Sequence, residues 1–257
     1  MDIYQHFRPE EQPFIDQVTD WLEQADRQYR TVVTDFLDPR EQLIFSSVVG
    51  QNEQINLDFY GGYHQSERKR AVLAPFYETI ENSDFTLSIL QGNYPTKFVS
   101  LSHRDLLGTL MSLGIQRKKI GDLLVEDGTF QIICDRDMAF YLKMNLTKIK
   151  NTSIKLSEVS EQDVIEPQHS WQEKEGTVSS IRLDAILKEI YQLSRQKAQD
   201  LIEKEAVKVN YRVVDQPAFQ LQPGDLLSVK SFGRSKVVSI LGETRKNKLR
   251  IKTAKLK

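Results

Sequence analysis

The residues best suited to chemistry lie near the carboxyl end of the chain, and their types suit phosphate binding. Arginine donates to phosphate oxygens in bidentate fashion, and lysine acts as a point charge. A serine that begins a helix adds exposed backbone N–H groups, which also favour anions. Such contacts position a protein on a nucleic acid without reading its bases. The candidates for phosphate-backbone contacts are Arg182, Ser194, Arg195, Lys197, Lys204 and Lys208, with Arg212, Arg234 and Lys236 in a second tier.

Two short helices and a run of strands are predicted to hold these residues. The apolar spacing over 183–190 predicts a helix with one buried face, capped by Ser179 or Ser180, and with Asp184 in its first turn. Ser194 caps a second helix. Alternation over 207–214 predicts a hairpin, and a turn leads into a strand over 226–230. The buried stripes are Leu183, Ile186, Leu187 and Ile190 in the first helix, and Ala198, Leu201 and Ile202 in the second.

This pattern resembles the S4 RNA-binding domain over about a quarter of the chain. Glu205-Ala206 and Tyr211 stand where the family commonly has glycine, which affects turn geometry more than the RNA-facing surface. The resemblance implies that the two helices dock on a small sheet and present basic residues to folded RNA. Asn210 is expected to hold the hairpin turn rather than to read a base.

The net charge of −1 conceals a strong asymmetry along the 257 residues. Residues 181–257 carry 17 Lys and Arg against 8 Asp and Glu, whereas residues 1–180 carry 18 against 28. A basic end beside an acidic remainder indicates a polyanionic partner at one end only. A single cysteine, Cys134, excludes an internal disulfide, and no signal peptide or membrane span is recognisable. We therefore expect a cytoplasmic protein that does not bind membranes.

Residues 81–160 show the order βαββαβ, which is typical of a ferredoxin-like domain. Ser102 and Asp135 are predicted to cap its two helices, and Glu126-Asp127-Gly128 predicts a hairpin between its middle strands. Modules of this class that stack RNA bases place several aromatic residues on the third strand. Here that strand offers only Phe130, so direct base stacking on this sheet is not expected.

The flanking segments are read more coarsely. Residues 1–80 are predicted to form a mixed α/β domain, with Asp38 capping a helix and a short helix over 66–74 that carries a solvated basic cluster. Residues 161–180 are polar and aperiodic, which predicts a linker in which His169 and Trp171 dock on a neighbouring domain. Residues 181–257 complete the S4-like domain, with an edge strand over 245–257. The fold class is α+β.

Two short motifs resemble catalytic sequences. His103-Arg104-Asp105 matches the centre of a kinase catalytic loop, but the phosphate loop and the Asp-Phe-Gly motif are missing, and a capping box explains the same residues. Arg182-Leu183-Asp184 resembles the triplet around the catalytic aspartate of pseudouridine synthases. In those enzymes the triplet lies in a separate large domain, whereas here it begins the S4-like segment. We expect no enzyme activity, no cofactor and no metal site.

The three-domain order, the run from Ser102 to Gly108 and the late Gly233-Arg234-Ser235 resemble the YlmH family over essentially the whole chain. The resemblance implies a non-catalytic protein that binds rRNA of the large ribosomal subunit and peptidyl-tRNA. It further implies a part in the rescue of stalled subunits, with an elongation factor of ribosome quality control as partner and alanine tailing of the nascent chain. A monomer is expected. Two alternatives stay open: an RNA-modifying enzyme, and a cell-division adaptor suggested by the family's gene setting.

Overall fold

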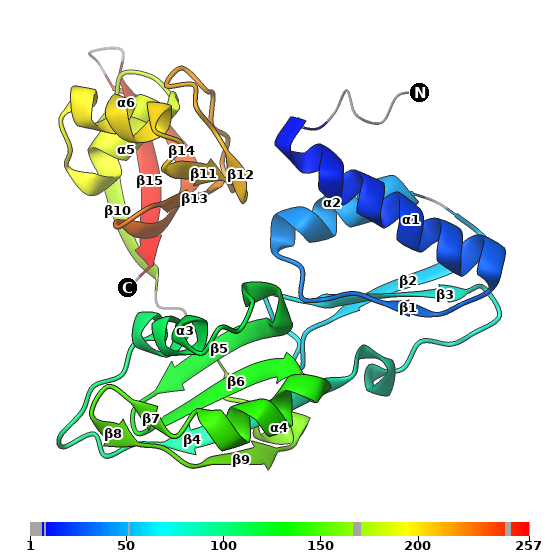
Figure 1. The fold of residues 1–257 in the computed structure, drawn as a ribbon. Coiled ribbons are helices and arrows are strands. Elements are labelled where there is room, and N and C mark those ends of the chain that lie inside the picture. Colours follow the sequence, from blue (N-terminus) through cyan, green and yellow to red (C-terminus); the bar gives the residue numbers. More distant parts are fainter. Residues whose placement is uncertain (1–6, 8, 51, 167–170, 245–247, 257) are drawn as a thin grey trace. The chain divides into compact units, whose positions relative to one another are not determined.

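The computed structural model describes residues 7, 9–50, 52–166, 171–244 and 248–256. They belong to two units, residues 1–167 and 168–257, each of which is described by itself (Figure 1). Helices and strands are mixed in both units, which confirms the α+β class. Among the described residues, none of the helices combines the length and apolar character needed to cross a bilayer.

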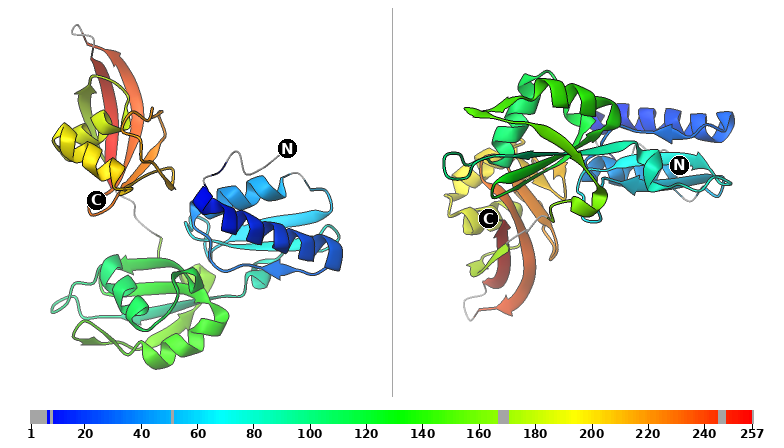
Figure 2. Two further views of the ribbon diagram at one scale, coloured as in Figure 1. Left: turned by 45° about the horizontal axis from the view of Figure 1, so that its top comes forward. Right: turned by 90° about the horizontal axis from the view of Figure 1, so that it is seen from below.

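The first unit begins with two helices that pack on one face of a three-stranded antiparallel sheet (Figures 1 and 2). The predicted capping box at Asp38 is confirmed: its carboxylate accepts from the backbone N–H of Glu41 at 2.9 Å, and the Glu41 carboxylate accepts from the backbone N–H of Asp38 at 2.6 Å. The elements are the 3-10 turn η2 (Pro9–Glu11), α1 (Gln12–Gln28), β1 (Val32–Val33), α2 (Pro39–Val49), β2 (Ile55–Tyr60) and β3 (Arg70–Pro75), with sheet order β1-β3-β2.

Strand β3 shows that the prediction of a helix over 66–74 was wrong. All six residues of β3 are buried, and it lies at the centre of its sheet. After Arg70 this strand is apolar, and a short apolar run has no period that separates a buried strand from a buried helix. The solvated basic cluster was also wrong in part, because Arg70 is 6% exposed and donates to the carbonyl oxygens of Thr34 and Thr86.

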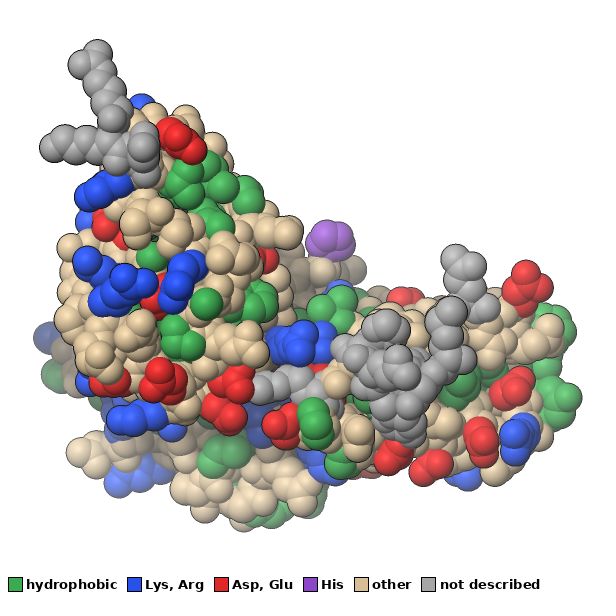
Figure 3. Space-filling view, turned by 90° about the horizontal axis from the view of Figure 1, so that it is seen from above, with side chains coloured by type: hydrophobic (Ala, Val, Ile, Leu, Met, Phe, Trp, Pro, Cys, Tyr) green, Lys and Arg blue, Asp and Glu red, His purple; other side chains and the backbone are tan. Residues whose placement is uncertain are grey.

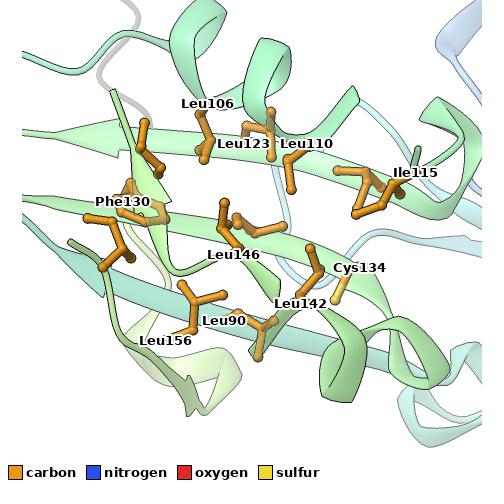
Figure 4. Close-up of a cluster of buried hydrophobic side chains, with 14 of the residues drawn as sticks. Leu90, Leu106, Leu110, Ile115, Leu123, Phe130, Cys134, Leu142, Leu146 and Leu156 are labelled. Atoms are coloured by element: carbon orange, nitrogen blue, oxygen red, sulfur yellow. The ribbon is translucent and has the colours of Figure 1, made fainter. Parts of the chain in front are cut away.

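The second half of the first unit has the predicted ferredoxin-like topology, with strand order β5-β6-β4-β9 and antiparallel pairing throughout. Helices α3 and α4 cover one face, and their leucines meet Phe130 and Cys134 of β6 (Figure 4). Ser102 and Asp135 cap these helices as predicted. The elements are η3 (Asn82–Phe85), β4 (Leu87–Asn93), α3 (His103–Ser112), η4 (Arg117–Lys119), β5 (Ile120–Glu126), β6 (Thr129–Asp135), α4 (Arg136–Asn145), β7 (Lys148–Ile149), β8 (Thr152–Ser153), β9 (Leu156–Val159) and η5 (Glu161–Asp163).

The other face of this sheet is covered by the chain itself. Phe36 packs there against Gly121, where an added Cβ would lie 2.6 Å from the ring. Gln131 is 0% exposed; its amide nitrogen donates to the Asp163 carbonyl at 2.7 Å, and its amide oxygen accepts from the backbone N–H of Ile165 at 2.8 Å. The face on which related modules stack bases is therefore occupied.

Hydrogen bonds and an ion pair join the two halves of the first unit. Asp122 accepts from the Tyr63 hydroxyl at 2.8 Å and from the backbone N–H groups of Glu67 and Arg68 at 2.7 and 3.0 Å. Lys119 lies 2.6 Å from Asp35 and 3.2 Å from Asp135. Its hydrogen bond to Asp35 raises the pKa of Lys119 above its usual value.

The second unit is a six-stranded antiparallel sheet with two helices, in the order β10-β15-β14-β13-β11-β12. Two predictions were wrong here. Residues 171–178, which were predicted as part of the linker, form the edge strand β10. The last strand, β15, was predicted to lie at an edge but is interior, because it pairs with β10 on one side and with β14 on the other. The Trp171 ring lies beneath the Lys236 ammonium of the same sheet instead of docking on another domain, and His169 falls outside the described residues. The elements are β10 (Trp171–Val178), α5 (Leu183–Tyr191), α6 (Arg195–Glu203), β11 (Val207–Val209), β12 (Arg212–Val213), β13 (Leu226–Val229), β14 (Gly233–Glu243) and β15 (Leu249–Leu256).

Candidate nucleic-acid interface

Helix α5 begins one residue after Arg182, which occupies the N-cap position without a side-chain cap. The expected caps, Ser179 and Ser180, are therefore wrong. Instead, the backbone N–H groups of Leu183 and Asp184 donate to the carbonyls of Phe219 and Pro217 at 2.9 and 3.2 Å. The loop between β12 and β13 therefore accepts from the first N–H groups of this helix, and Arg182 lies at the surface beside it.

A buried carboxylate organises the two arginines. Asp184 is 0% exposed and accepts from Nε and Nη2 of Arg182 at 3.0 and 3.1 Å, and from Nε of Arg195 at 3.2 Å. The amide of Gln199 lies 3.4 Å away. Burial opposes ionisation of Asp184, but hydrogen bonds from Arg182 and Arg195 outweigh it and hold its pKa below the usual value.

Both guanidinium groups keep donors for an outside partner. The side chain of Arg182 is 32% exposed and that of Arg195 is 58% exposed. Of five N–H donors in each group, the bonds to Asp184 use those on two nitrogens of Arg182 and on one of Arg195. The remaining donors are held in a fixed orientation, as recognition of a phosphate requires.

The same arrangement argues against a catalytic role for Asp184. Its carboxylate has no exposed surface and is shared by two guanidinium groups. A nucleophile must reach the atom that it attacks, and this oxygen pair is covered and hydrogen-bonded by the two arginines. The likeness of Arg182-Leu183-Asp184 to the pseudouridine synthase triplet therefore does not extend to a usable site.

Helix α6 presents its first turn at the surface, as predicted. The Ser194 hydroxyl accepts from the backbone N–H of Lys197 at 3.1 Å, and the Lys197 side chain is exposed. At the other end, Glu205 adopts φ +54°, and the N–H groups of Glu205 and Ala206 return to the carbonyls of Ile202 and Leu201. This is a Schellman closure with glutamate where glycine is favoured.

The hairpin between β11 and β12 has the predicted turn. Asn210 and Tyr211 have φ values of +47° and +67°, the two positive angles of a type I′ turn. The Asn210 amide donates to Asp225 at 2.8 Å, and its oxygen accepts from the backbone N–H of Leu226 at 2.9 Å. Asn210 therefore braces the turn against the next loop.

The candidate residues do not share one surface. On β11, β13 and β14, alternate side chains pack under the helices, including Val209, Leu227 and Val237. Lys208 and Arg234 lie opposite Ser228 on its two neighbouring strands, so these side chains project from the other face of the sheet. The helix-side set is Arg182, Ser194, Arg195, Lys197, Lys204 and Arg212, and the sheet-side set is Lys208, Arg234 and Lys236.

Two of the three sheet-side cations lie over aromatic rings. The guanidinium of Arg234 lies 6.0 Å from the centre of the Tyr211 ring, and the ammonium of Lys236 lies 4.5 Å from that of Trp171. These contacts engage the two cations within the fold. Figure 3 shows one face of the molecule, on which Lys and Arg side chains lie among Asp and Glu side chains.

Two participants in the helix-side site were not predicted as such. Asp184 was expected only to suit the helix end, and Gln199, whose amide lies 3.4 Å from the Asp184 carboxylate, was not among the candidate residues. A signal for Asp184 was available, because Asp184, Leu187 and Tyr191 are spaced i, i+3, i+7 and share the buried face. A carboxylate on such a face needs a cationic partner.

Comparisons with known proteins define the class of this chain. Family models match residues 10–78 ("YlmH, N-terminal"), 81–163 ("Putative RNA-binding domain in YlmH") and 181–227 ("S4 domain"). Together with the fold, these matches define a protein that joins a YlmH-type N-terminal domain to a domain of RNA-binding class and an S4 domain. The chain belongs to the YlmH family.

Two relatives support this membership. The "Ribosome-associated protein quality control protein P2" of Bacillus subtilis (strain 168) is 44% identical over 250 residues, which cover 97% of each chain. A solved structure, "Cell division protein ylmH from Streptococcus pneumoniae", is 30% identical with a TM-score of 0.55 and covers 63% of this chain and 99% of its own. The resemblance expected from the sequence is confirmed.

Proposed function

We propose that this protein is a non-catalytic RNA-binding factor of the cytoplasm that acts on the large ribosomal subunit. The observation that carries the proposal is the buried Asp184 carboxylate, which holds the partly exposed Arg182 and Arg195 together. The relative named for ribosome-associated quality control gives the biological setting. The net excess of nine positive charges over 181–257 supports a polyanionic partner.

In this mechanism the helix-side set binds rRNA through its phosphates. Arg182 and Arg195 donate from fixed positions, and the first turn of α6 adds backbone N–H groups and Lys197. Lys204 and Arg212 extend the surface. The sheet-side residues Lys208, Arg234 and Lys236 contribute less, because two of them are already engaged with aromatic rings.

The finer assignment follows the family resemblance. The ribosome-bound state would include peptidyl-tRNA, and an elongation factor of ribosome quality control would use it to extend a stalled nascent chain with alanine. This protein would act as a monomer that stabilises the tRNA–subunit complex and performs no chemistry itself. Its contribution would be the surface that it presents, with no cofactor or metal.

A pair of matched double variants tests the proposal. Arg182→Ala with Arg195→Ala removes two cations from the helix side, and Lys208→Ala with Lys236→Ala removes two from the sheet side. Co-sedimentation with purified large subunits should fall strongly for the first pair and little for the second. Equal losses for both pairs, with native circular dichroism, would reject the helix-side assignment.

One alternative has a specific observation in its favour, namely the name of the Streptococcus pneumoniae relative as a cell division protein. An adaptor would work through protein contacts of residues 1–180. Deletion of 181–257 distinguishes the two. If the protein is an adaptor, cells with the truncated protein should behave like the wild type, whereas if it is a ribosomal factor they should behave like cells that lack the protein. The enzyme alternative is tested by mass analysis of rRNA and tRNA from cells that lack the protein, where a modification restored by the gene would support it.

A further inference from the structure

The ferredoxin-like part of the first unit has a second strongly basic surface. Segments 94–104 and 147–155 contain five Lys and Arg and no Asp or Glu, although the unit as a whole has 17 Lys and Arg against 26 Asp and Glu. Segments with the average composition of the unit would carry a net negative charge. We define the loop-end surface by its exposed residues Lys97, Phe98, Arg104, Lys148, Lys150 and Lys155.

The fold brings the two segments to one end of the domain. The first segment follows β4, whose last residue, Asn93, pairs with Thr129 at the hairpin end of β6. The second precedes β9, whose first residue, Leu156, pairs with Gly92 at the same end. Lys150 joins them directly, because its ammonium lies 2.9 Å from the Ser100 carbonyl and 2.8 Å from the Asp105 carboxylate. Figure 1 shows the loop before α3 and the β7–β8 hairpin at this end.

The charges at this end are largely unneutralised within the described residues. Only Lys150 of the five cations has a carboxylate partner there. At the opposite end of the strands, Lys118 and Lys119 pair with Asp35, and Lys119 also reaches Asp135. The β5–β6 turn carries Glu126 and Asp127, which limit the basic surface on that side.

An exposed aromatic ring accompanies the cations. Phe98 is 78% exposed, and the Lys97 ammonium lies 5.6 Å from the centre of its ring. Basic residues beside an exposed ring are the two components with which proteins bind single-stranded or looped nucleic acid, through phosphate contacts and base stacking. The sheet face cannot serve this purpose, because Phe36 and the segment around Asp163 cover it.

We propose that the loop-end surface is a second RNA-binding site, which takes an unpaired RNA segment with its backbone along the lysines and a base on Phe98. This inference rests on the proposed RNA-binding function and adds a contact outside the S4 domain. It also locates the RNA contact of this domain on its connecting loops instead of on its sheet. The two sites together would let the chain bind one RNA surface through both units.

The test uses the full-length protein and purified large ribosomal subunits over a range of salt. Arg104→Ala with Lys148→Ala should make the log–log salt slope shallower by about 1.4–1.8, because each phosphate contact contributes about 0.7–0.9. The matched control, Arg30→Ala with Arg136→Ala, removes two exposed arginines of the same unit and should leave the slope unchanged. Phe98→Ala should weaken binding at every salt concentration with the slope retained, and Phe98→Tyr should restore it.

The outcomes separate this inference from the proposed function. If Arg182→Ala with Arg195→Ala weakens binding but the loop-end pair behaves like its control, with native circular dichroism, the loop-end site is overturned and the S4 assignment stands. If the wild-type protein does not bind large subunits, both proposals are overturned. A shallower slope for the loop-end pair alone supports the second site.

Discussion

Substitution of Asp184 by Asn separates orientation from charge. The change removes a negative charge from a basic surface, so attraction by net charge alone predicts tighter RNA binding. In our account the opposite follows, because Asp184 holds Arg182 and Arg195 through three hydrogen bonds of 3.0–3.2 Å. Without the carboxylate, both side chains must be ordered when RNA binds.

The size of the effect follows from the two freed side chains. Ordering one long side chain on binding costs about 0.5–1.5 kcal/mol, so two cost about 1–3 kcal/mol. Affinity for large ribosomal subunits should fall about 5- to 150-fold. The assay is equilibrium binding at one fixed salt concentration, with Asp200→Asn as the control. Asp200 lies on α6 and accepts from Gln196, so its loss changes the charge equally without releasing an arginine.

Folding of the variant needs a separate measurement. Loss of the charge-assisted hydrogen bonds should lower the free energy of unfolding by about 1–3 kcal/mol. The loss is no larger because water can solvate both guanidinium groups in the variant. The lowered pKa of Asp184 means that its contribution is present above the unfolded value, about 3.9, and is lost as pH falls through the folded value. The wild type and the variant should therefore converge in acid. Unchanged or tighter binding by a folded Asp184→Asn protein would refute the role of orientation.

Three further predictions concern stability, each measured by urea unfolding. Gly121→Ala should destabilise by about 1–3 kcal/mol, because its Cβ would meet the Phe36 ring at 2.6 Å, whereas Gly108→Ala, in open space on α3, should be neutral or stabilising. Equal effects would remove the argument for close packing at this face. Hydrogen bonds from Lys150 and Ser102 lower the pKa of Asp105 to about 2, so stability should decline between about pH 4 and pH 2, and Asp105→Asn should flatten that decline. Glu205→Gly should stabilise by about 1 kcal/mol because φ is +54° there; a destabilised variant would contradict the strain.

Local signals were sufficient where the determining contacts are short-range. The capping boxes at Asp38 and Ser102 each depend on residues within a four-residue stretch, and the structure contains both. The β5–β6 hairpin follows from Asp127-Gly128, with Gly128 at φ +85°. The βαββαβ order was therefore predictable, because both of its helix starts and its middle hairpin have a signal of this kind.

Signals failed where distant pairing decides the structure. Strand β3 lies between β1 and β2, and its burial on both faces removes the alternation that would identify it. Strand β10 has four consecutive exposed residues, from Gln172 to Glu175, and so resembles a linker. Its partner β15 lies more than seventy residues away, and their pairing is what makes β15 an interior strand.

The candidate site was predictable as a list of residues, but its division into faces was not. Arg182 and Arg195 meet because both reach Asp184, a contact that spans the turn between two helices. The separation of Lys208 and Lys236 from them depends on which face of the sheet the helices cover. Strand alternation fixes that relation only when the strand order is known.

Site-specific photo-crosslinking tests the central claim most directly. A photoreactive amino acid is placed at Lys197, on the helix side, or at Lys236, on the sheet side, in the full-length protein bound to large ribosomal subunits. Our account predicts crosslinks to rRNA or tRNA from position 197 and few or none from position 236. Crosslinks to RNA from position 236 with none from position 197 would contradict it.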